Sequence, residues 1–270
     1  MKIWIAFIFL LFSVRLNAAI VDTVSIYSAA MKKEHKAVVI IPDSYKNSKK
    51  EYPVVYLLHG YSGDYANWIK RVPGLQHQSD LHQQIIVCPD GGYSSWYLNS
   101  PIDSSMKYET YIAVEVVQYI DKHYRTIKKR EGRAITGLSM GGHGALLLAF
   151  NHSKTFGAAG SMSGGLDLMQ SSVKYDLMKR IGDTLTYRDN WEKFSMISRI
   201  EKGSELPLAI MVDCGTSDFF FDVNRNFHLK MLELKIPHDY IERPGNHSWN
   251  YWSNAVEYQL LFFRKFFGEW

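Results

Sequence analysis

The stretch Ala134-Ile-Thr-Gly-Leu-Ser-Met-Gly-Gly-His-Gly144 joins a short apolar run to a second apolar, helix-forming run that continues to Phe150. It contains the pattern Gly-x-Ser-x-Gly, with Ser139 at its centre. A serine on a tight strand-to-helix turn needs neighbours that are nearly free of side chains. Its hydroxyl would then be exposed beside free backbone N–H groups and the positive end of a helix dipole. Ser139 is therefore a candidate nucleophile; the alternative is a glycine-rich turn that only caps a helix.

Apolar runs typical of buried strands alternate with helical patterns along the chain. The expected strands are 21–27, 37–41, 53–58, 85–88, 133–138, 158–162, 208–212 and 238–242. The expected helices are 108–124, 140–150, 223–234 and 248–267, which carry apolar residues at helical spacing. This order predicts an α/β fold, a mostly parallel central sheet with helices on both faces. Residues 20–270 are expected to form one domain, with a helical insertion over the active site at about 165–207.

The N-terminus has the features of a secretory signal peptide over residues 1–19. Lys2 provides a basic start, an apolar run follows to Val14, and the small residues Ala18 and Ala19 come soon after. We therefore expect an exported protein, periplasmic or secreted, with cleavage after Ala18 or Ala19 and no stable membrane insertion afterwards. The alternative is an uncleaved N-terminal anchor.

Composition limits the function classes that need to be considered. The chain has 270 residues, of which 46% are hydrophobic, so it can bury a substantial core. The formal charge is +4, and loss of Lys2 and Arg15 would leave 29 basic side chains against 27 acidic ones. That excess is too small to indicate nucleic-acid binding. Cys88 and Cys214 are the two cysteines; two separate buried thiols are favoured over a disulfide, and no metal site is expected.

An oxyanion-binding loop is expected after the strand at 53–58. The sequence Leu57-Leu-His-Gly-Tyr-Ser-Gly63 has glycines that would let the backbone approach a substrate closely. The backbone N–H groups of Tyr61 and Met140 are the expected donors to an oxyanion. His59 precedes the nucleophile and a tight turn, so we expect it to position the loop and not to act as a base.

The acid of a catalytic triad should follow a later strand, and three aspartates compete for the role. Asp213 falls within or at the very end of the strand at 208–212. Asp218 comes after the Gly215-Thr216 turn, at the expected carboxyl edge of the sheet. Asp222 is close to a helix start and is interpreted as an N-terminal cap. Asp218 is therefore the predicted acid, whose role would be to orient the imidazole and stabilise its charged form.

The base should come last, in the order Ser, Asp, His. His247 lies in the glycine-containing turn Arg243-Pro-Gly-Asn-His-Ser-Trp249, after the final expected strand and before a helix. His228 falls inside a helical pattern and His238 at a strand start, which suits structural roles better. His247 is therefore the predicted general base.

These motifs together resemble one branch of the α/β-hydrolases. That branch includes esterase D (S-formylglutathione hydrolase), bacterial feruloyl and acetylxylan esterases, tributyrin-type esterases and mycolyltransferases. The matching segments are Tyr56-Leu-Leu-His-Gly-Tyr-Ser-Gly63, Pro89-Asp-Gly-Gly92, Ser95-Trp-Tyr97, Tyr108-Glu-Thr-Tyr111, Gly137-Leu-Ser-Met-Gly-Gly142, Cys214-Gly-Thr-Ser-Asp218 and Gly245-Asn-His-Ser-Trp249. The resemblance implies the α/β-hydrolase fold, the triad of Ser139, Asp218 and His247, and an oxyanion hole at Tyr61 and Met140.

The resulting functional hypothesis is a secreted serine carboxylic ester hydrolase that forms an acyl-enzyme on Ser139. Its expected substrates are plant-type saccharides with feruloyl or acetyl groups, and neither a cofactor nor a metal is needed. Trp96, Tyr97 and Trp249 are candidate substrate contacts because flat rings suit an acyl or a sugar group; core packing is the alternative for each. The alternative functions are a tributyrin-type short-chain esterase, an S-formylglutathione hydrolase-like thioesterase, a mycolyltransferase-type acyltransferase and a non-catalytic binding protein.

Overall fold

The computed structural model describes residues 19–171, 174–201 and 208–268. The predicted signal peptide, residues 1–19, lies outside these residues except for Ala19. Within the described residues, no helix is both long enough and apolar enough to cross a lipid bilayer.

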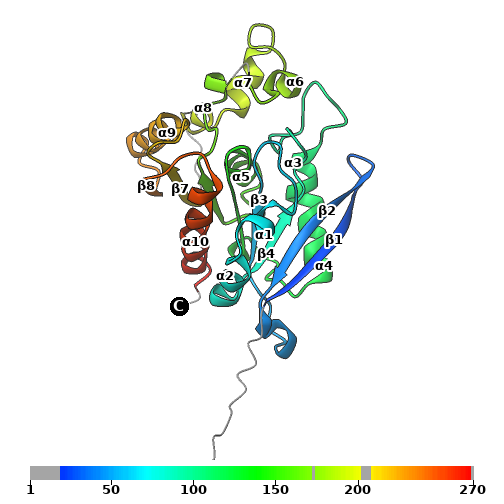
Figure 1. Cartoon of the computed structure of the whole chain (residues 1–270). Helices are drawn as coiled ribbons and strands as arrows, with labels where there is room; N and C mark the ends of the chain where they lie inside the picture. The colour runs from blue at the N-terminus through cyan, green and yellow to red at the C-terminus, as the bar shows by residue number, and fades with distance from the viewer. Residues whose placement is uncertain (1–18, 172–173, 202–207, 269–270) are drawn as a thin grey trace, which may run out of the picture.

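A single mixed sheet runs through the molecule (Figure 1). Its strands are β1 (Ile20–Ser28), β2 (Lys33–Ile41), β3 (Val54–Leu58), β4 (Ile85–Pro89), β5 (Arg133–Gly137), β6 (Ala158–Met162), β7 (Ala209–Gly215) and β8 (Asp239–Arg243). Their order across the sheet is β1-β2-β4-β3-β5-β6-β7-β8. The pairs β1–β2 and β2–β4 are antiparallel, and the pairs from β4 onward are parallel. Each expected strand is present, and the predicted α/β class with a mostly parallel sheet is confirmed.

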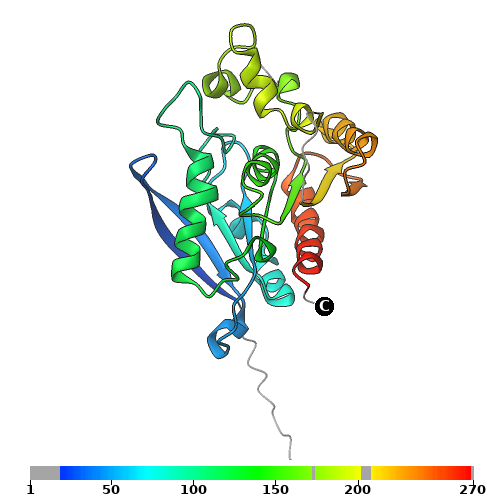
Figure 2. The same cartoon turned by 180° about the vertical axis from the view of Figure 1, so that it is seen from behind.

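Helices cover both faces of this sheet (Figures 1 and 2). Helices α1 (Asn67–Arg71), α2 (Leu75–His82) and α10 (Trp249–Phe266) lie on one face. The other face carries α3 (Tyr108–Thr110), the π-helical stretch η2 (Tyr111–Val116), α4 (Val117–His123), α5 (Met140–Asn151), α8 (Met196–Glu201) and α9 (Phe221–Glu233). The remaining helical pieces are η1 (Asp43–Asn47), η3 (Arg130–Gly132), η4 (Leu168–Ser171), α6 (Leu177–Ile181) and α7 (Arg188–Phe194). The sequence patterns missed α1 and α2, and the expected helix 108–124 is divided by the π-helical stretch.

The central strands are buried because helices cover them on both sides. Every residue of β3, β4, β5 and β6 is buried. Alternate residues of each strand enter opposite cores, as Tyr56 and Val55 do in β3. A strand in this position is mostly apolar at both odd and even positions, which explains the continuous apolar sequences of β3 and β4.

The parallel strands bring four loops to one edge of the sheet. Leu58 at the end of β3 pairs with Gly137 at the end of β5, and Gly215 of β7 pairs with Arg243 of β8. The chain leaves these strands toward the loops that carry Tyr61, Ser139, Asp218 and His247. Parallel strands place their carboxyl ends on the same side, so residues far apart in sequence meet there.

The turn between β5 and α5 is held in a backbone conformation that residues other than glycine seldom adopt. Ser139 has φ +54° and ψ −116°. Its N–H donates to the carbonyl of Met162 (2.9 Å), and its own carbonyl accepts the N–H of His143 (3.1 Å). A Cβ atom on Gly141 would lie 2.5 Å from the carbonyl oxygen of His59. The turn can form only because Gly141 has no side chain, so that the backbone of α5 packs directly against the end of β3.

Short helices occupy the segment in which an insertion was predicted. η4, α6, α7 and α8 lie between β6 and β7, at one end of the molecule (Figure 1). Helix α5 is tied to this segment by the buried ring of His143, whose Nε2 is 2.8 Å from the carbonyl oxygen of Phe194. Residues 172–173 and 202–207 of the segment lie outside the described residues.

The two cysteines are separate, buried thiols, as the sequence favoured. Cys88 lies in β4 and Cys214 in β7, with three strands between them in the sheet. Burial raises the pKa of both thiols well above the ordinary value. Both therefore behave as small apolar side chains of the core.

Replacement of Gly141 by alanine should destabilise the turn. The added Cβ would meet the backbone of Leu58 and His59, which cannot move without disturbing the sheet, so we expect a loss of about 1–3 kcal/mol in the free energy of unfolding. Urea denaturation would measure it. Gly74→Ala is the matched control, because a Cβ there has nothing within 4 Å. Equal stability of the two variants would contradict the crowding argument.

Acid should destabilise the fold through His143. Burial lowers the pKa of this imidazole from 6.5 to about 4 in the folded state. The unfolded chain binds the proton more readily, so this contribution is intact above pH 6.5 and is lost as the pH falls toward 4. The unfolding free energy of the wild type should fall between pH 7 and pH 5. In His143→Gln we expect this fall to be smaller by about 2 kcal/mol. Denaturant titrations at both pH values would measure it, with the exposed His77→Gln as control; an unchanged decrease in His143→Gln would contradict the assignment.

Candidate active site

Three side chains from separate loops form a hydrogen-bonded chain at the carboxyl edge of the sheet. The Oγ of Ser139 lies 2.9 Å from Nε2 of His247. Nδ1 of the same ring lies 2.9 Å from both Oδ1 and Oδ2 of Asp218. Nδ1–H can donate to the carboxylate while Nε2 accepts the serine proton. This is the arrangement in which an imidazole can take a proton from a hydroxyl.

The surroundings of His247 restrict how its ring can turn. The carboxylate of Asp218 is fully buried and also accepts the N–H of Phe220 (2.8 Å), which fixes its orientation. The rings of Phe219 and Trp252 lie 4.1 and 4.8 Å from the imidazole, centroid to centroid. The ring is thus held between aromatic neighbours, and only a small part of it is exposed to solvent.

The other two candidate aspartates do not reach His247. Asp213 is buried in β7, where its carboxylate accepts hydrogen bonds from Arg243 and from the hydroxyl of Tyr251. Burial raises the pKa of Asp213 to about 6, against the opposing effects of Tyr251 and Arg243. Asp222 lies inside the first turn of α9, and the cap position belongs to Phe220, so its interpretation as a helix cap was wrong.

Two backbone N–H groups beside Ser139 are free to bind an oxyanion. The neighbouring loop donors are used internally: the N–H of Ser62 donates to Tyr93 O (2.7 Å) and that of Gly63 to Gly60 O (3.1 Å). Within the described part of the chain, the N–H groups of Tyr61 and Met140 donate to no protein acceptor. Met140 is the first residue of α5, where an N–H has no intrahelical partner and the helix dipole favours negative charge.

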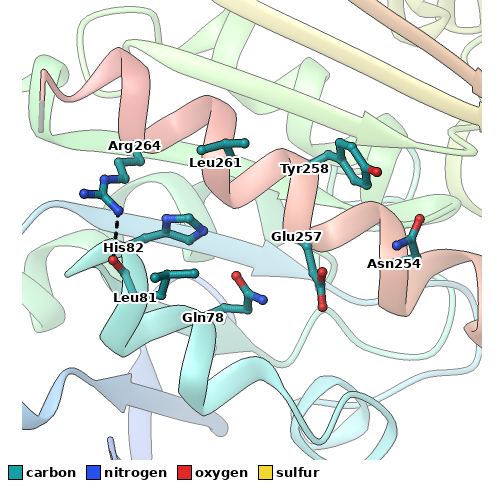
Figure 3. Close-up of a pocket in the computed structure, with 8 residues that line it drawn as sticks. All are labelled: Gln78, Leu81, His82, Asn254, Glu257, Tyr258, Leu261 and Arg264. Carbon is teal, nitrogen blue, oxygen red and sulfur yellow. Dashed lines mark hydrogen bonds between the residues drawn. The ribbon is translucent and has the colours of Figure 1, made fainter. Parts of the chain in front are cut away.

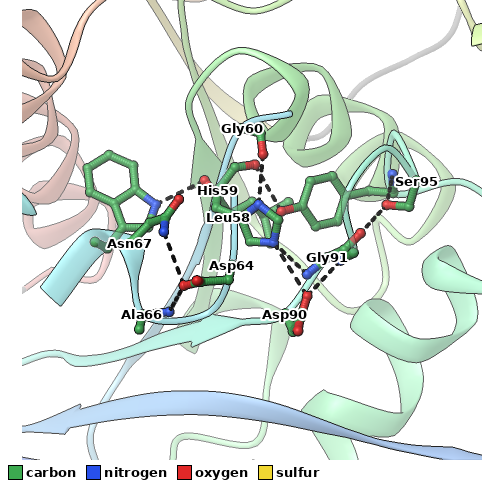
Figure 4. Close-up of polar contacts among 12 residues, drawn as sticks. Leu58, His59, Gly60, Asp64, Ala66, Asn67, Asp90, Gly91 and Ser95 are labelled. Atoms are coloured by element: carbon green, nitrogen blue, oxygen red, sulfur yellow. Dashed lines mark hydrogen bonds and ion pairs between the residues drawn. The ribbon is translucent and has the colours of Figure 1, made fainter. Parts of the chain in front are cut away.

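His59 is buried beneath this loop and uses both ring nitrogens locally (Figure 4). Its Nδ1 is 2.8 Å from Gly60 O, and its Nε2 accepts the N–H of Gly91 (2.7 Å). The N–H of Gly91 requires an unprotonated Nε2, so Nδ1 carries the proton and donates to Gly60. His59 therefore joins the loop after β3 to the loop after β4, as a positioning residue.

A cavity of about 380 Å³ contains Ser139 and His247. It is lined by Gly60, Tyr61, Ser62, Gly63, Asn67, Arg71, Leu138, Ser139, Tyr175, Phe219, His247, Trp249 and Trp252. Trp249 had been predicted as a substrate contact; Tyr175, Phe219, Trp252 and Arg71 had not. Phe219 could have been found from its position directly after Asp218. Tyr175 and Arg71 carried no such signal, because only the folded chain brings their segments to the cavity.

Trp96 and Tyr97, the other two predicted substrate contacts, do not line this cavity. Both are buried, with positive φ angles of 53° and 59°. The indole of Trp96 packs against His143 and donates to the carbonyl of Tyr175 (3.0 Å). The hydroxyl of Tyr97 donates to His59 O (2.9 Å). Both side chains pack beneath the site and hold its loops in place, so the prediction that they contact the substrate was wrong.

A second cavity, of about 390 Å³, lies between α2 and α10 (Figure 3). Its lining residues are Gln78, Leu81, His82, Asn254, Glu257, Tyr258, Leu261 and Arg264, and none of them lines the cavity of Ser139. The described residues contain no group of three or more side chains placed to hold a metal ion.

Comparisons with known proteins agree with this fold. An esterase of Mycobacterium tuberculosis (strain H37Rv) is 30% identical over 237 residues, which cover 77% of this chain and 51% of the relative. The chain therefore spans about half the length of that relative. An acetyl esterase of Caldicellulosiruptor saccharolyticus is 26% identical over 256 residues, which cover 86% of this chain and 94% of the relative.

A solved structure of a ferulic acid esterase superposes with a TM-score of 0.80 and 30% identity, covering 92% of this chain and 98% of the other. The model of the esterase family described as "Putative esterase" matches residues 28–263. The chain belongs to this family of α/β-hydrolases.

Proposed function

We propose that the protein is a serine carboxylic ester hydrolase. The observation that carries this proposal is the hydrogen-bonded chain from Ser139 through His247 to Asp218, next to two unused backbone N–H groups. The names of relatives, an acetyl esterase and a ferulic acid esterase, support the same reaction class.

The reaction takes place in two acyl-transfer steps. Ser139 Oγ attacks the ester carbonyl carbon as its proton moves to His247 Nε2, and the negative charge on the carbonyl oxygen is stabilised by the N–H groups of Tyr61 and Met140. The bond to the alcohol oxygen then breaks, and that oxygen takes the proton from His247. Water next attacks the acyl-enzyme by the same route, which releases the acid and restores Ser139. Asp218 keeps the imidazole in the required tautomer and stabilises its charged form.

We propose acylated saccharides as substrates, with acetyl or feruloyl as the acyl group. The aromatic side chains of Tyr61, Tyr175, Phe219 and Trp249 in the cavity wall support this choice, because flat rings pack against both sugar rings and a feruloyl ring. The two relatives named for acetyl and ferulic acid esters support it as well.

We also propose that the protein is exported, on the strength of the signal-peptide pattern in residues 1–19. The N–H of Ala19 donates to Asp80 Oδ2 (3.0 Å), and its carbonyl accepts from Gln76 (3.1 Å). Cleavage after Ala18 would keep both contacts and place the new ammonium group beside the Asp80 carboxylate. N-terminal sequencing of the protein recovered outside the cytoplasm tests this; retention of the full-length chain in the cytoplasm contradicts it.

Ser139→Ala should lower kcat on 4-nitrophenyl acetate by on the order of 10⁴ or more, because the attacking oxygen is removed. Steady-state assays would measure it, and circular dichroism would check that the variant is folded. A fluorophosphonate should label the wild type with one equivalent and leave the variant unlabelled. Retained turnover in Ser139→Ala would remove this residue from the mechanism.

A panel of acetyl, butyryl and feruloyl esters tests the proposed substrate class. We expect higher kcat/KM on acetylated or feruloylated oligosaccharides than on simple alkyl esters, because the sugar ring adds contact with the aromatic wall. Chromatography of the products should show free acid; transfer of the acyl group to an added sugar would favour an acyltransferase instead. Activity confined to butyryl and longer alkyl esters would contradict a saccharide substrate.

A further inference from the structure

The cavity that contains Ser139 has an arginine in its wall. Arg71, the last residue of α1, is the only lining residue among those described that carries a fixed charge at neutral pH. His247 is the other basic side chain there, and no aspartate or glutamate among the described residues lines the cavity. A site for neutral esters needs no cation at this position.

Arg71 also differs from the other arginines of the described residues. Each of the other nine side chains has a hydrogen bond or an ion pair within the protein, such as Asp121 for Arg133 or Asp213 for Arg243. Arg71 has no such partner in the part of the chain that the structure describes, and its side chain is exposed to solvent. Its five N–H donors are therefore available to a bound molecule.

A row of aromatic rings connects the helix that carries Arg71 with His247. Trp68, three residues earlier on the same helix, packs against Trp249 with ring centroids 5.2 Å apart. Trp249 packs against Trp252 (5.5 Å), and Trp252 against His247 (4.8 Å). His247 must deliver its proton to the oxygen of the departing alcohol. The leaving oxygen must therefore come within reach of His247, at the end of this row of rings.

We propose that Arg71 selects esters whose alcohol half carries a carboxylate, as an acylated acidic sugar does. This inference rests on the proposed ester hydrolysis and narrows its substrate class. The planar guanidinium matches a carboxylate with two parallel hydrogen bonds, a geometry that a lysine or a neutral side chain does not provide. The contact lies at the mouth of an open cavity, so dissolved salt should weaken it.

A matched pair of aryl acetates tests the proposal. 4-Acetoxybenzoate carries the carboxylate on the alcohol half, and 4-acetoxybenzamide is its neutral counterpart. The measured quantity is the ratio of kcat/KM for the charged ester to kcat/KM for the neutral ester, so that their intrinsic reactivities cancel between variants. We expect Arg71→Gln to lower this ratio about tenfold and Arg71→Lys to lower it less, with the wild-type ratio falling as NaCl is raised.

Two controls separate the contact from general charge effects. Lys70→Gln removes the same charge from the neighbouring residue, which does not line the cavity, and should leave the ratio unchanged. A second pair, 4-nitrophenyl hydrogen adipate and 4-nitrophenyl hexanoate, puts the carboxylate on the acyl half; Arg71→Gln should leave its ratio unchanged.

The outcomes distinguish the two proposals. If Arg71→Gln leaves the aryl acetate ratio unchanged, or if Lys70→Gln lowers it equally, the role of Arg71 is contradicted while ester hydrolysis stands. A changed ratio for the adipate pair alone would contradict the placement on the alcohol half. If the wild type hydrolyses neither aryl acetate, the proposed function fails, and the inference fails with it.

Discussion

The structure depends on one close contact between two stretches of backbone, at the point where β5 turns into α5. Gly141 lies so near the end of β3 that a single Cβ would come within 2.5 Å of the carbonyl oxygen of His59. This approach directs Ser139 out of the sheet with a positive φ and brings the N-terminus of α5 next to the loop after β3. The strain at Ser139 costs on the order of 1–3 kcal/mol and is maintained by the packed sheet on both sides.

The same contact sets the position of the two free N–H groups. Met140 follows Ser139 at the start of the helix, and Tyr61 follows the Leu58–Gly60 segment against which the helix packs. The buried His59 fixes that segment because its ring binds Gly60 within the segment and Gly91 in the loop after β4. Donors that are held in place before the reaction stabilise developing charge without having to reorganise.

A second group of interactions, at the carboxyl ends of β7 and β8, holds the imidazole of His247. β7 and β8 are adjacent and parallel, so the loops that carry Asp218 and His247 leave the sheet together. The N–H of Ser217 donates to Gly245 O (2.8 Å), and the N–H of Thr216 donates to Arg243 O (2.8 Å). These two hydrogen bonds join the loops. The buried Asp213, with Arg243 and Tyr251, anchors the base of these loops instead of taking part in the chemistry. The aromatic rings around His247 restrict how the imidazole can turn, and its Nε2 lies 2.9 Å from Ser139 Oγ.

The sequence by itself determined the strands, the class of fold and the serine turn. A parallel strand covered on both faces is mostly apolar, so β3 and β4 could be predicted from their continuous apolar runs. The glycines around Ser139 reflect the steric requirement of the turn. Chain order singled out Asp218 and His247, but which aspartate meets the imidazole depends on how β7 and β8 pair. Only the tertiary structure decided that Trp249 lines the cavity while Trp96 and Tyr97 lie beneath it, and that Arg71 enters the wall. Those facts depend on distances between segments far apart in the chain, which no local pattern of residues encodes.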